Sequence, residues 1–161
     1  DVEACMNQLE GVDNVAAVEL GLQEDAQPND VKSIIATASG GLLPVLTRLP
    51  LMRALDLAWI AEHAGAQALT TAAPPRGTMH NTKGTGWVSG RLYGQFVFPI
   101  ILDLVRNIHG SVTLPIIASG GIHTCNQAQA CLESGASAVQ IDSLVWTDLD
   151  AVKQIVDPER V

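Results

Sequence analysis

The fold is decided by the stretch LPIIASGGIHTCNQAQACLESGASAVQIDSLVW, residues 114–146. An apolar run at 114–118 leads into the pair Gly120–Gly121, a helical segment opens near Asn126, and a second apolar run spans 137–141. Glycines allow the backbone to approach an anion closely, and the free N–H groups at the start of a helix attract one. The stretch therefore predicts a strand–turn–helix–strand unit with an anion-binding turn at the glycine pair, and we expect residues 114–146 to form the phosphate site.

The same alternation of apolar runs and helical segments fills the rest of the chain. Strands that alternate with helices predict an α/β fold with a parallel sheet, whose strands are continuous apolar runs because both faces are covered. The predicted strands are 15–20, 44–49, 67–72, 114–118 and 137–141, and the predicted helices include 2–10, 28–37, 52–63 and 93–109. Pro99 lies inside the last of these helices and is expected to bend it.

Composition narrows the class of protein. The chain has 161 residues, of which 47% are hydrophobic, so we expect a single domain with a buried core over 1–161. A formal net charge of −8 argues against nucleic acid or an anionic membrane as the main partner. Cys5, Cys125 and Cys131 lack the spacing of a metal site, and no apolar run is long enough to span a membrane. We therefore expect no metal, no membrane span and a cytoplasmic location.

Segments along nearly the whole chain resemble the C-terminal half of the dihydroorotate dehydrogenase family, the FMN-dependent barrel enzymes of pyrimidine biosynthesis. The matching segments occur in the order of the family: VAAVELG (15–21), LPVLTRLP (43–50), HAGAQALTTA (63–72), WVSGRLYGQFVFPIILDLVRNI (87–108) and LPIIASGGI with SGASAVQID (114–142). The resemblance implies a (β/α)8 TIM-barrel type of fold and FMN as the cofactor.

The resemblance makes the five predicted strands the fourth to eighth strands of the barrel. A closed barrel of this type needs eight, so roughly 100 residues of the family barrel lie outside the chain. Two readings stay open. The chain is part of something longer, or another polypeptide or a second copy completes the barrel.

The resemblance also implies where a phosphate would be held. In the family, backbone N–H groups of three turns bind the FMN phosphate, and the corresponding residues here are Ser89–Gly90, Gly120–Gly121 and Asp142–Ser143. The third turn departs from the Gly-Thr or Gly-Ser of the family. A carboxylate about 5 Å from a phosphate costs on the order of 1 kcal/mol, although the Ser143 hydroxyl remains a donor.

Arg48 stands where the family usually has a lysine that contacts the edge of the flavin ring. Arginine keeps the positive charge but is larger and planar. The alternative is that Arg48 pairs with a neighbouring carboxylate such as Glu19.

The catalytic base of the family is a Cys or Ser in the loop after the fourth strand. That position falls at Leu22 or its neighbours, where Glu24 and Asp25 are the candidate replacements. A substrate-binding Asn of the family corresponds to Ala72 or Ala73. Loss of a positioned base typically costs about 10²–10⁴ in rate, so we expect little dihydroorotate oxidation.

A long loop, residues 73–92, separates the third predicted strand from the next helix. Connections of this kind usually have about two to six residues, and long loops at strand ends often bind ligands. This one contains Arg76, Lys83 and Arg91, three of nine basic residues, together with His80. We expect this loop to form a cation-rich edge (a lip) of a ligand site or, alternatively, a solvated flap whose charges bind nothing specific. Trp87 is expected either to cap a pocket or to anchor the loop.

Three functions remain open on the sequence, and so does the question of whether the chain is an enzyme. The first is an FMN-dependent oxidoreductase acting on a CH–CH bond, with degenerate catalysis. The second is a non-catalytic scaffold or interaction subunit with a barrel-derived fold. The third is a protein that binds another phosphorylated metabolite at the retained phosphate site.

Overall fold

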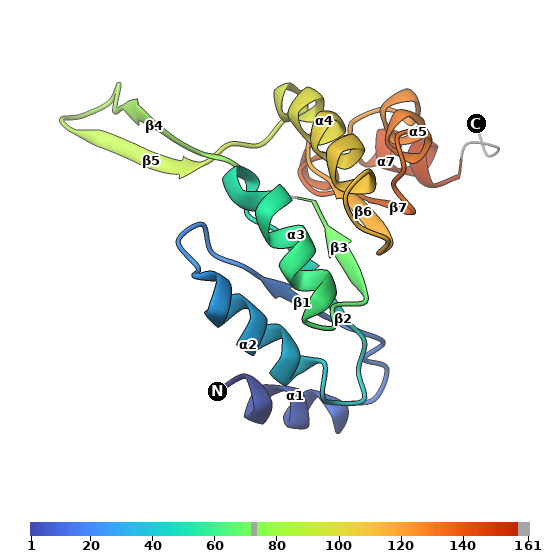
Figure 1. Cartoon of the computed structure of the whole chain (residues 1–161). Coiled ribbons are helices and arrows are strands. Elements are labelled where there is room, and N and C mark those ends of the chain that lie inside the picture. Colours follow the sequence, from blue (N-terminus) through green and yellow to red (C-terminus); the bar gives the residue numbers. More distant parts are fainter. Residues whose placement is uncertain (72–73, 158–161) are drawn as a thin grey trace.

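A parallel sheet forms the centre of the computed structural model, which describes residues 1–71 and 74–157 (Figure 1). All neighbouring strands in this sheet are parallel, and their spatial order follows the chain: β1 (Val18–Gly21), β2 (Val45–Arg48), β3 (Ala68–Thr70), β6 (Ile116–Ser119) and β7 (Ala138–Gln140). The predicted order and direction of the strands are confirmed. The fold is an α/β fold of the partial TIM-barrel type.

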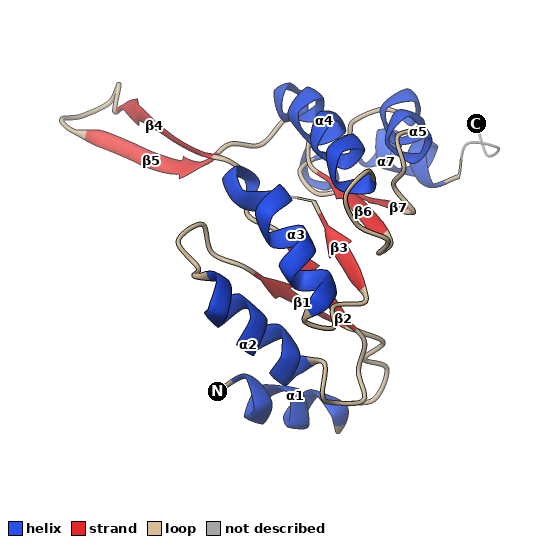
Figure 2. Cartoon of the chain, viewed as in Figure 1, coloured by secondary structure: helices blue, strands red, loops and turns tan. Residues whose placement is uncertain are grey.

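Helices connect the strands and cover one face of the sheet (Figure 2). They are α1 (Val2–Glu10), α2 (Pro28–Ala38), α3 (Ala54–His63), α4 (Phe98–His109), α5 (Cys125–Glu133), α6 (Leu144–Thr147) and α7 (Leu149–Val156), with 3-10 turns at Leu51–Arg53 and Gln95–Val97. The helices α2, α4 and α5 contact β2, β6 and β7, respectively. The part of the chain that the structure describes contains no helix long and apolar enough to cross a membrane.

Successive side chains of each strand point to opposite faces of the sheet. Helices cover one face, and the other, here called the open face, has no covering layer within the described residues. Val45 and Thr47 of β2 are fully buried beneath the helices, whereas Leu46 and Arg48, which point the other way, are partly exposed. The register of the strands places the same alternation across the sheet. The residues that the register places on the open face are Glu19, Leu46, Arg48, Ala68, Thr70, Ile117, Ser119, Ala138 and Gln140; Thr70 and Ser119 among them are nevertheless buried by neighbouring groups.

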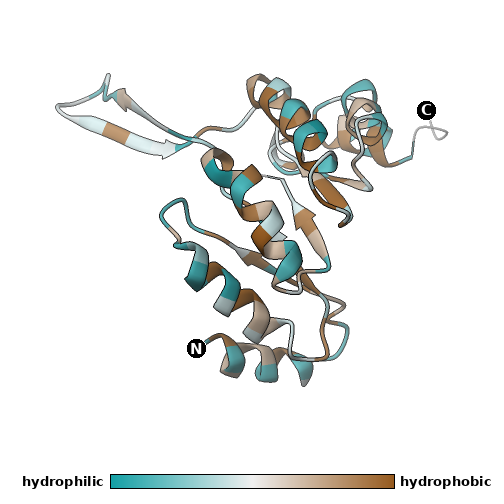
Figure 3. Ribbon diagram, viewed as in Figure 1, coloured by the Kyte–Doolittle hydropathy of each residue, from teal (hydrophilic) through white to brown (hydrophobic). Residues whose placement is uncertain are grey.

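The core lies between the covered face and the helices. Leu57 of α3, Leu69 of β3, Ile101 of α4 and Ile116 of β6 are buried to within 1% of full burial. Brown and teal turns alternate along α2 and α4, as expected for helices with one apolar side (Figure 3). The sheet and its helices therefore share a main core, and Met6, Ala38 and Val45 form a smaller cluster beside α1.

The structure departs from the predicted loop at 73–92. Residues 76–91 form an antiparallel hairpin of β4 (Arg76–His80) and β5 (Trp87–Arg91), here called the ribbon, which projects away from the sheet (Figure 1). Its strands contain glycine and its side chains are largely exposed, so it lacks the apolar run that predicts the strands of the central sheet.

The helix predicted at 93–109 is also shorter than expected. A 3-10 turn precedes α4, which begins at Phe98, so Pro99 lies in the first helical turn and does not bend the helix interior. Proline is tolerated there because the N–H groups of the first turn have no helical partner.

Candidate functional site

The carboxyl ends of the strands bring together the glycine turn after β6, the end of β7 and the start of α4. Gly120 and Gly121 have φ angles of +117° and +70°, which side chains rarely adopt. A small pocket at this point is lined by Pro74, Leu92, Tyr93, Gly94, Val97, Gly120, Gly121 and Asp142. The two turns of residues 114–146 that were predicted to hold a phosphate therefore meet at one end of the sheet.

Close packing against α4 explains why the turn requires glycine. A Cβ atom added to Gly121 would lie 2.5 Å from the backbone nitrogen of Phe98, and one added to Gly120 would lie 3.1 Å from the Ile101 side chain. Within the part of the chain that the structure describes, no group accepts a hydrogen bond from either glycine N–H. Backbone donors in such a buried turn normally have a partner, so this turn can accept an external anion.

Two hydrogen bonds with Thr71 fix Ser119, the residue that directly precedes the glycine turn. Thr71, just after β3, donates its hydroxyl to the Ser119 carbonyl at 3.1 Å and accepts from the Ser119 N–H at 2.6 Å. Both residues are buried. Threonine in an apolar strand gave no sequence signal for this role, which depends on β3 and β6 being neighbours.

The end of β7 contributes a carboxylate and a hydroxyl. The Asp142 carboxylate accepts a hydrogen bond from the backbone N–H of Ser143, and the Ser143 hydroxyl lies 3.4 Å from Nε2 of His123. His123 directly follows the glycine turn, and its backbone N–H donates to Gln127 at 2.8 Å. Sequence reasoning missed His123, although its place after Gly120-Gly121-Ile122 was the available signal.

Arg48 pairs with Glu19 on the open face of the sheet. The Nη1 atom of Arg48 lies 3.1 Å from a carboxylate oxygen of Glu19, whose other oxygen accepts a hydrogen bond from Thr70 at 3.2 Å. The guanidinium lies over Gly21, where an added Cβ would be 2.7 Å from Nη2. The carboxylate partner suggested by the sequence is the one observed.

The loop after β1 contains no base in contact with the glycine turn. Leu22 is buried in the core, and its N–H donates to the Arg48 carbonyl at 3.0 Å. Glu24 and Asp25 are exposed in the following turn. Arg53 holds this loop by donating to the Ala26 carbonyl at 2.5 Å, a contact between two loops that the sequence did not reveal.

Comparison with known proteins identifies the relatives of this arrangement. The family model described as dihydroorotate dehydrogenase matches residues 58–158, well over half of the chain. The chain belongs to the dihydroorotate dehydrogenase family. The match includes the glycine turn and the end of β7 but begins after β1 and β2.

Individual relatives extend the similarity toward the N-terminus. The catalytic subunit of dihydroorotate dehydrogenase B (NAD(+)) from Streptococcus pneumoniae serotype 4 is 32% identical over 64% of this chain and 34% of that protein. Dihydroorotate dehydrogenase A (fumarate) from Limosilactobacillus reuteri is 27% identical over 80% of the chain and 43% of that protein. The corresponding B-type catalytic subunit of Geobacter metallireducens is 27% identical over 84% of the chain and 47% of that protein. The chain thus spans between a third and half of the length of these relatives.

Dihydroorotate dehydrogenases of this family are FMN flavoproteins, and the site can be compared with a flavin phosphate. The glycine N–H groups, which have no acceptor among the described residues, and the Ser143 hydroxyl fit a phosphate, whereas the Asp142 carboxylate disfavours one by like charge. Ser89 and Gly90 lie in the ribbon, where the Ser89 hydroxyl is 2.8 Å from that of Thr78, and neither residue lines the pocket. Leu92, Tyr93 and Gly94 line it instead.

The remaining predicted features of the dihydroorotate dehydrogenase site are the substrate residues and the cations of the long loop. Ala72 and Ala73, the positions of the substrate-binding Asn, are outside the described residues. Arg76 and Arg91 are directly opposite each other in the ribbon. Trp87 is exposed there, and its ring meets that of His80 edge-on, with 5.4 Å between the ring centroids. Among the residues that the structure describes, no three His, Cys, Asp or Glu side chains gather as a metal site would require.

Proposed function

We propose that the chain is the phosphate-binding part of a dihydroorotate dehydrogenase-like FMN oxidoreductase. The observation that supports this most is that the N–H groups of Gly120 and Gly121, beside a pocket at the carboxyl ends of the strands, have no acceptor among residues 1–71 and 74–157. Barrels of this type bind phosphate at that end. The glycine turn would hold the phosphate, and Ser143, positioned by His123, would donate its hydroxyl to it.

A bound flavin would accept the hydride that is removed from a CH–CH bond of the substrate. The residues of this chain supply binding and charge. Arg48 at the end of β2 would contribute positive charge near the flavin ring. This charge is partly neutralised by Glu19, whose carboxylate oxygen lies 3.1 Å from Nη1 of Arg48. The Glu19 contact therefore weakens the effect that Arg48 has on a reduced, anionic flavin.

We further propose that this chain oxidises dihydroorotate weakly or not at all. Leu22 is buried and has no proton-accepting group, and Glu24 and Asp25 are exposed carboxylates that would repel the negatively charged substrate. Steady turnover of dihydroorotate with added FMN and an electron acceptor would contradict this proposal. Loss of that turnover in Glu24→Gln or Asp25→Asn would then identify the base.

The binding proposal is tested by titrating the purified chain with FMN and following flavin fluorescence. Asp142→Asn removes the charge but keeps an oxygen that can accept from the Ser143 N–H. Relief of about 1 kcal/mol of repulsion should tighten binding roughly fivefold. The control Asp13→Asn makes the same charge change in an exposed segment away from the pocket and should leave the affinity unchanged.

Loss-of-function variants complete the test. His123→Ala or Ser143→Ala should weaken FMN binding, because the hydroxyl loses its position or is removed. No FMN binding by the wild-type chain, or affinities equal in Asp142→Asn and Asp13→Asn, would count against a phosphate at this site. If inorganic phosphate competes with FMN while riboflavin does not bind, the site recognises a phosphate in general, as in the metabolite-binding alternative.

The open face of the sheet supports a second proposal, that another polypeptide completes the barrel. Five parallel strands leave β1 and β7 with unpaired edges and leave the side chains of Leu46, Ala68 and Ile117 without a covering layer within the described residues. In this case the chain acts as one part of a larger flavoprotein or as a non-catalytic subunit. A complex that lacks the yellow flavin absorbance would favour the subunit.

A further inference from the structure

Thr71 lies directly after β3 and is fully buried, and its hydroxyl bonds to both backbone groups of Ser119. The hydroxyl accepts from the Ser119 N–H at 2.6 Å and donates to the Ser119 carbonyl at 3.1 Å. A hydroxyl can serve both groups because it has one proton to donate and lone pairs that accept. Ser119 is only 8% exposed, so water does not readily replace this partner.

The two contacts take the place of the next step in the sheet ladder. β3 and β6 are parallel, and the Thr71 N–H still donates to the Ile117 carbonyl at 2.9 Å, as a ladder bond does. In a continued ladder, the N–H and the carbonyl of Ser119 would bond to main-chain groups of the neighbouring strand. The Thr71 hydroxyl bonds to both instead, so Ser119 keeps its hydrogen bonds at the point where the sheet ends.

The carbonyl of Ser119 and the N–H of Gly120 belong to the same peptide unit. The peptide bonds of the described residues are trans, and a trans unit is planar, with its N–H opposite to its carbonyl. The hydrogen bond from the Thr71 hydroxyl to the Ser119 carbonyl therefore sets the direction of the Gly120 N–H, which points away from Thr71. Gly120 lines the pocket at the carboxyl ends of the strands.

Gly120 does not hold this direction by itself. Its φ is +117°, and glycine has little steric preference, so the peptide unit before it can turn over by a joint change of the Ser119 ψ and the Gly120 φ. Such a flip would put the Ser119 carbonyl oxygen where the Gly120 N–H now lies. An oxygen at that position would repel an anion that the N–H attracts.

The other end of the glycine turn is anchored to α5. The backbone N–H of His123 donates to the Gln127 side chain at 2.8 Å, and the Gln127 N–H donates to the Thr124 hydroxyl at 3.2 Å. Thr71 supplies the corresponding anchor at the start of the turn. The glycine N–H groups between the two anchors have no acceptor among residues 1–71 and 74–157.

We propose that Thr71 is a positioning residue for the phosphate site. Its hydroxyl holds the Ser119–Gly120 peptide unit in one orientation, so the Gly120 N–H is in place before the ligand arrives. A donor that is already in place needs no reorganisation on binding, whereas a unit that flips lowers the apparent affinity by the fraction of molecules in which it is misplaced. This inference rests on the proposed binding of phosphate at the glycine turn.

Titration with FMN, followed by flavin fluorescence, tests the effect on binding. Thr71→Val keeps the shape of the side chain but removes the hydroxyl, and it should weaken FMN binding roughly fivefold. Inorganic phosphate, measured by its competition with FMN, should lose affinity by a similar factor, because the lost contact concerns the phosphate. Thr71→Ser keeps the hydroxyl and should bind FMN within about twofold of the wild type.

Thr47→Val is the matched control. Thr47 is fully buried in β2, and its hydroxyl has no hydrogen-bond partner among the described residues, so its removal should leave FMN affinity unchanged. Far-UV circular dichroism shows whether each variant is folded. If Thr71→Val does not fold, Thr71→Ser and Thr71→Ala replace it, because these two variants differ from each other only by the hydroxyl.

Backbone amide NMR of the ligand-free chain tests the positioning directly. In Thr71→Val, the Ser119 amide should exchange with solvent faster and the Gly120 signal should broaden, whereas the amides of α1 and α2 should not change. A general loss of stability would instead speed exchange throughout the chain.

The outcomes separate this proposal from the proposed function. Equal FMN affinity in the wild type and Thr71→Val, weak binding by Thr71→Ser, or unchanged Ser119 and Gly120 signals would each overturn the role of Thr71. If the wild-type chain binds no FMN, the proposed function fails, and the NMR comparison still decides whether Thr71 fixes the turn.

Discussion

Glu62 connects α3 to the segment before β6 by accepting two hydrogen bonds from Thr113. The backbone N–H and the hydroxyl of Thr113 each lie 2.7 Å from the same carboxylate oxygen. The hydroxyl contact, followed by the backbone contact, lowers the pKa of Glu62. A carboxyl whose pKa is lowered by folding stabilises the protein above its unfolded pKa, and this stabilisation is lost as the pH falls through the folded pKa.

Glu62→Gln should therefore lower the free energy of unfolding at neutral pH but not in strong acid. Solvent screens this partly exposed contact, so we expect a loss under about 1 kcal/mol. Urea unfolding of both proteins at pH 7 and below the folded pKa measures the difference. If the free energies of unfolding of the two proteins differ by the same amount in acid as at neutral pH, the charge of Glu62 is not responsible for the difference.

Cys131 and Cys125 occupy the same helix in different environments. Burial raises the pKa of the Cys131 thiol to about 11, whereas Cys125 and Cys5 are exposed. Because the thiolate is the reactive form, a thiol reagent at pH 8 should modify Cys5 and Cys125 quickly and Cys131 only after denaturation. Cys125→Ser and Cys131→Ser identify the sites, and fast modification of Cys131 in the native protein would contradict its burial.

At the scale of single residues, the sequence predicts which chemical groups a site contains better than it predicts which residues contact one another. The alternative partner of Arg48, Glu19, could be named because both residues fall at the ends of neighbouring strands. His123 and Arg53 were missed, because their contacts depend on how loops from different units approach one another.

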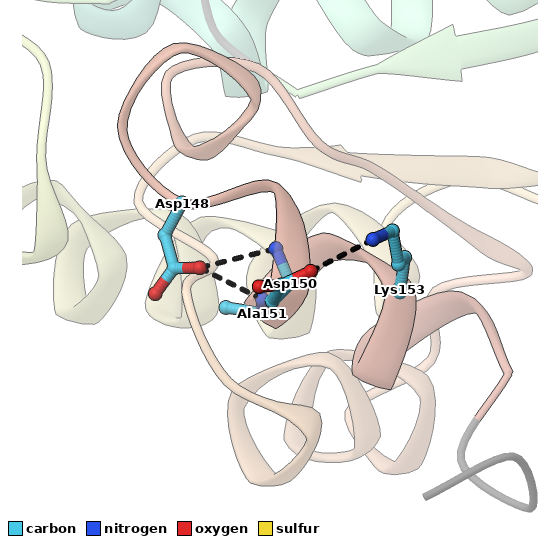
Figure 4. Close-up of polar contacts among 4 residues, drawn as sticks. All are labelled: Asp148, Asp150, Ala151 and Lys153. Carbon is cyan, nitrogen blue, oxygen red and sulfur yellow. Dashed lines mark hydrogen bonds and ion pairs between the residues drawn. The ribbon is translucent and has the colours of Figure 1, made fainter.

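At the scale of elements, α7 depends on a single capping side chain. Asp148 accepts hydrogen bonds from the backbone N–H groups of Asp150 and Ala151 at 3.1 and 3.0 Å, and Asp150 pairs with Lys153 on the helix surface at 2.7 Å (Figure 4). The cap satisfies two donors that have no partner within the helix.

Asp148→Ala should lower the free energy of unfolding by about 1 kcal/mol, the usual cost of losing such a cap. Asp150→Asn is the matched control, since it removes the exposed charge pair but leaves the cap and should have little effect. Thermal unfolding of the two variants gives the comparison. Equal shifts in both would mean that charge near the helix start matters more than the cap.

Elements with long apolar runs were predictable, and the ribbon was not. Each strand of the central sheet carries apolar residues toward the helices, so its signal survives in the sequence. The sequence predicts that both faces of the sheet are covered, whereas within the described residues helices cover one of them. The ribbon strands are exposed on both faces and contain glycines, and their pairing is visible only as a register of opposite residues.

At the scale of the whole molecule, the open face of the sheet determines how the protein behaves in isolation. In an eight-stranded barrel this face is the packed interior, and five strands cannot close around it. Leu46 and Ile117 on this face are partly exposed, and Ala138 is exposed. The strand order was predictable from the sequence, but the extent of this exposure required the register of all five strands.

The isolated chain should therefore bind the dye ANS in its native state, because ANS fluoresces on contact with exposed apolar surface. Leu46→Lys places a charge in the middle of the open face and should clearly reduce the fluorescence. Leu42→Lys is the control, since Leu42 is 87% exposed in a loop outside the sheet and should change the signal little. If the dye does not bind, or if both variants reduce the signal equally, other parts of the protein cover the open face, and the proposal that another polypeptide completes the barrel loses its physical basis.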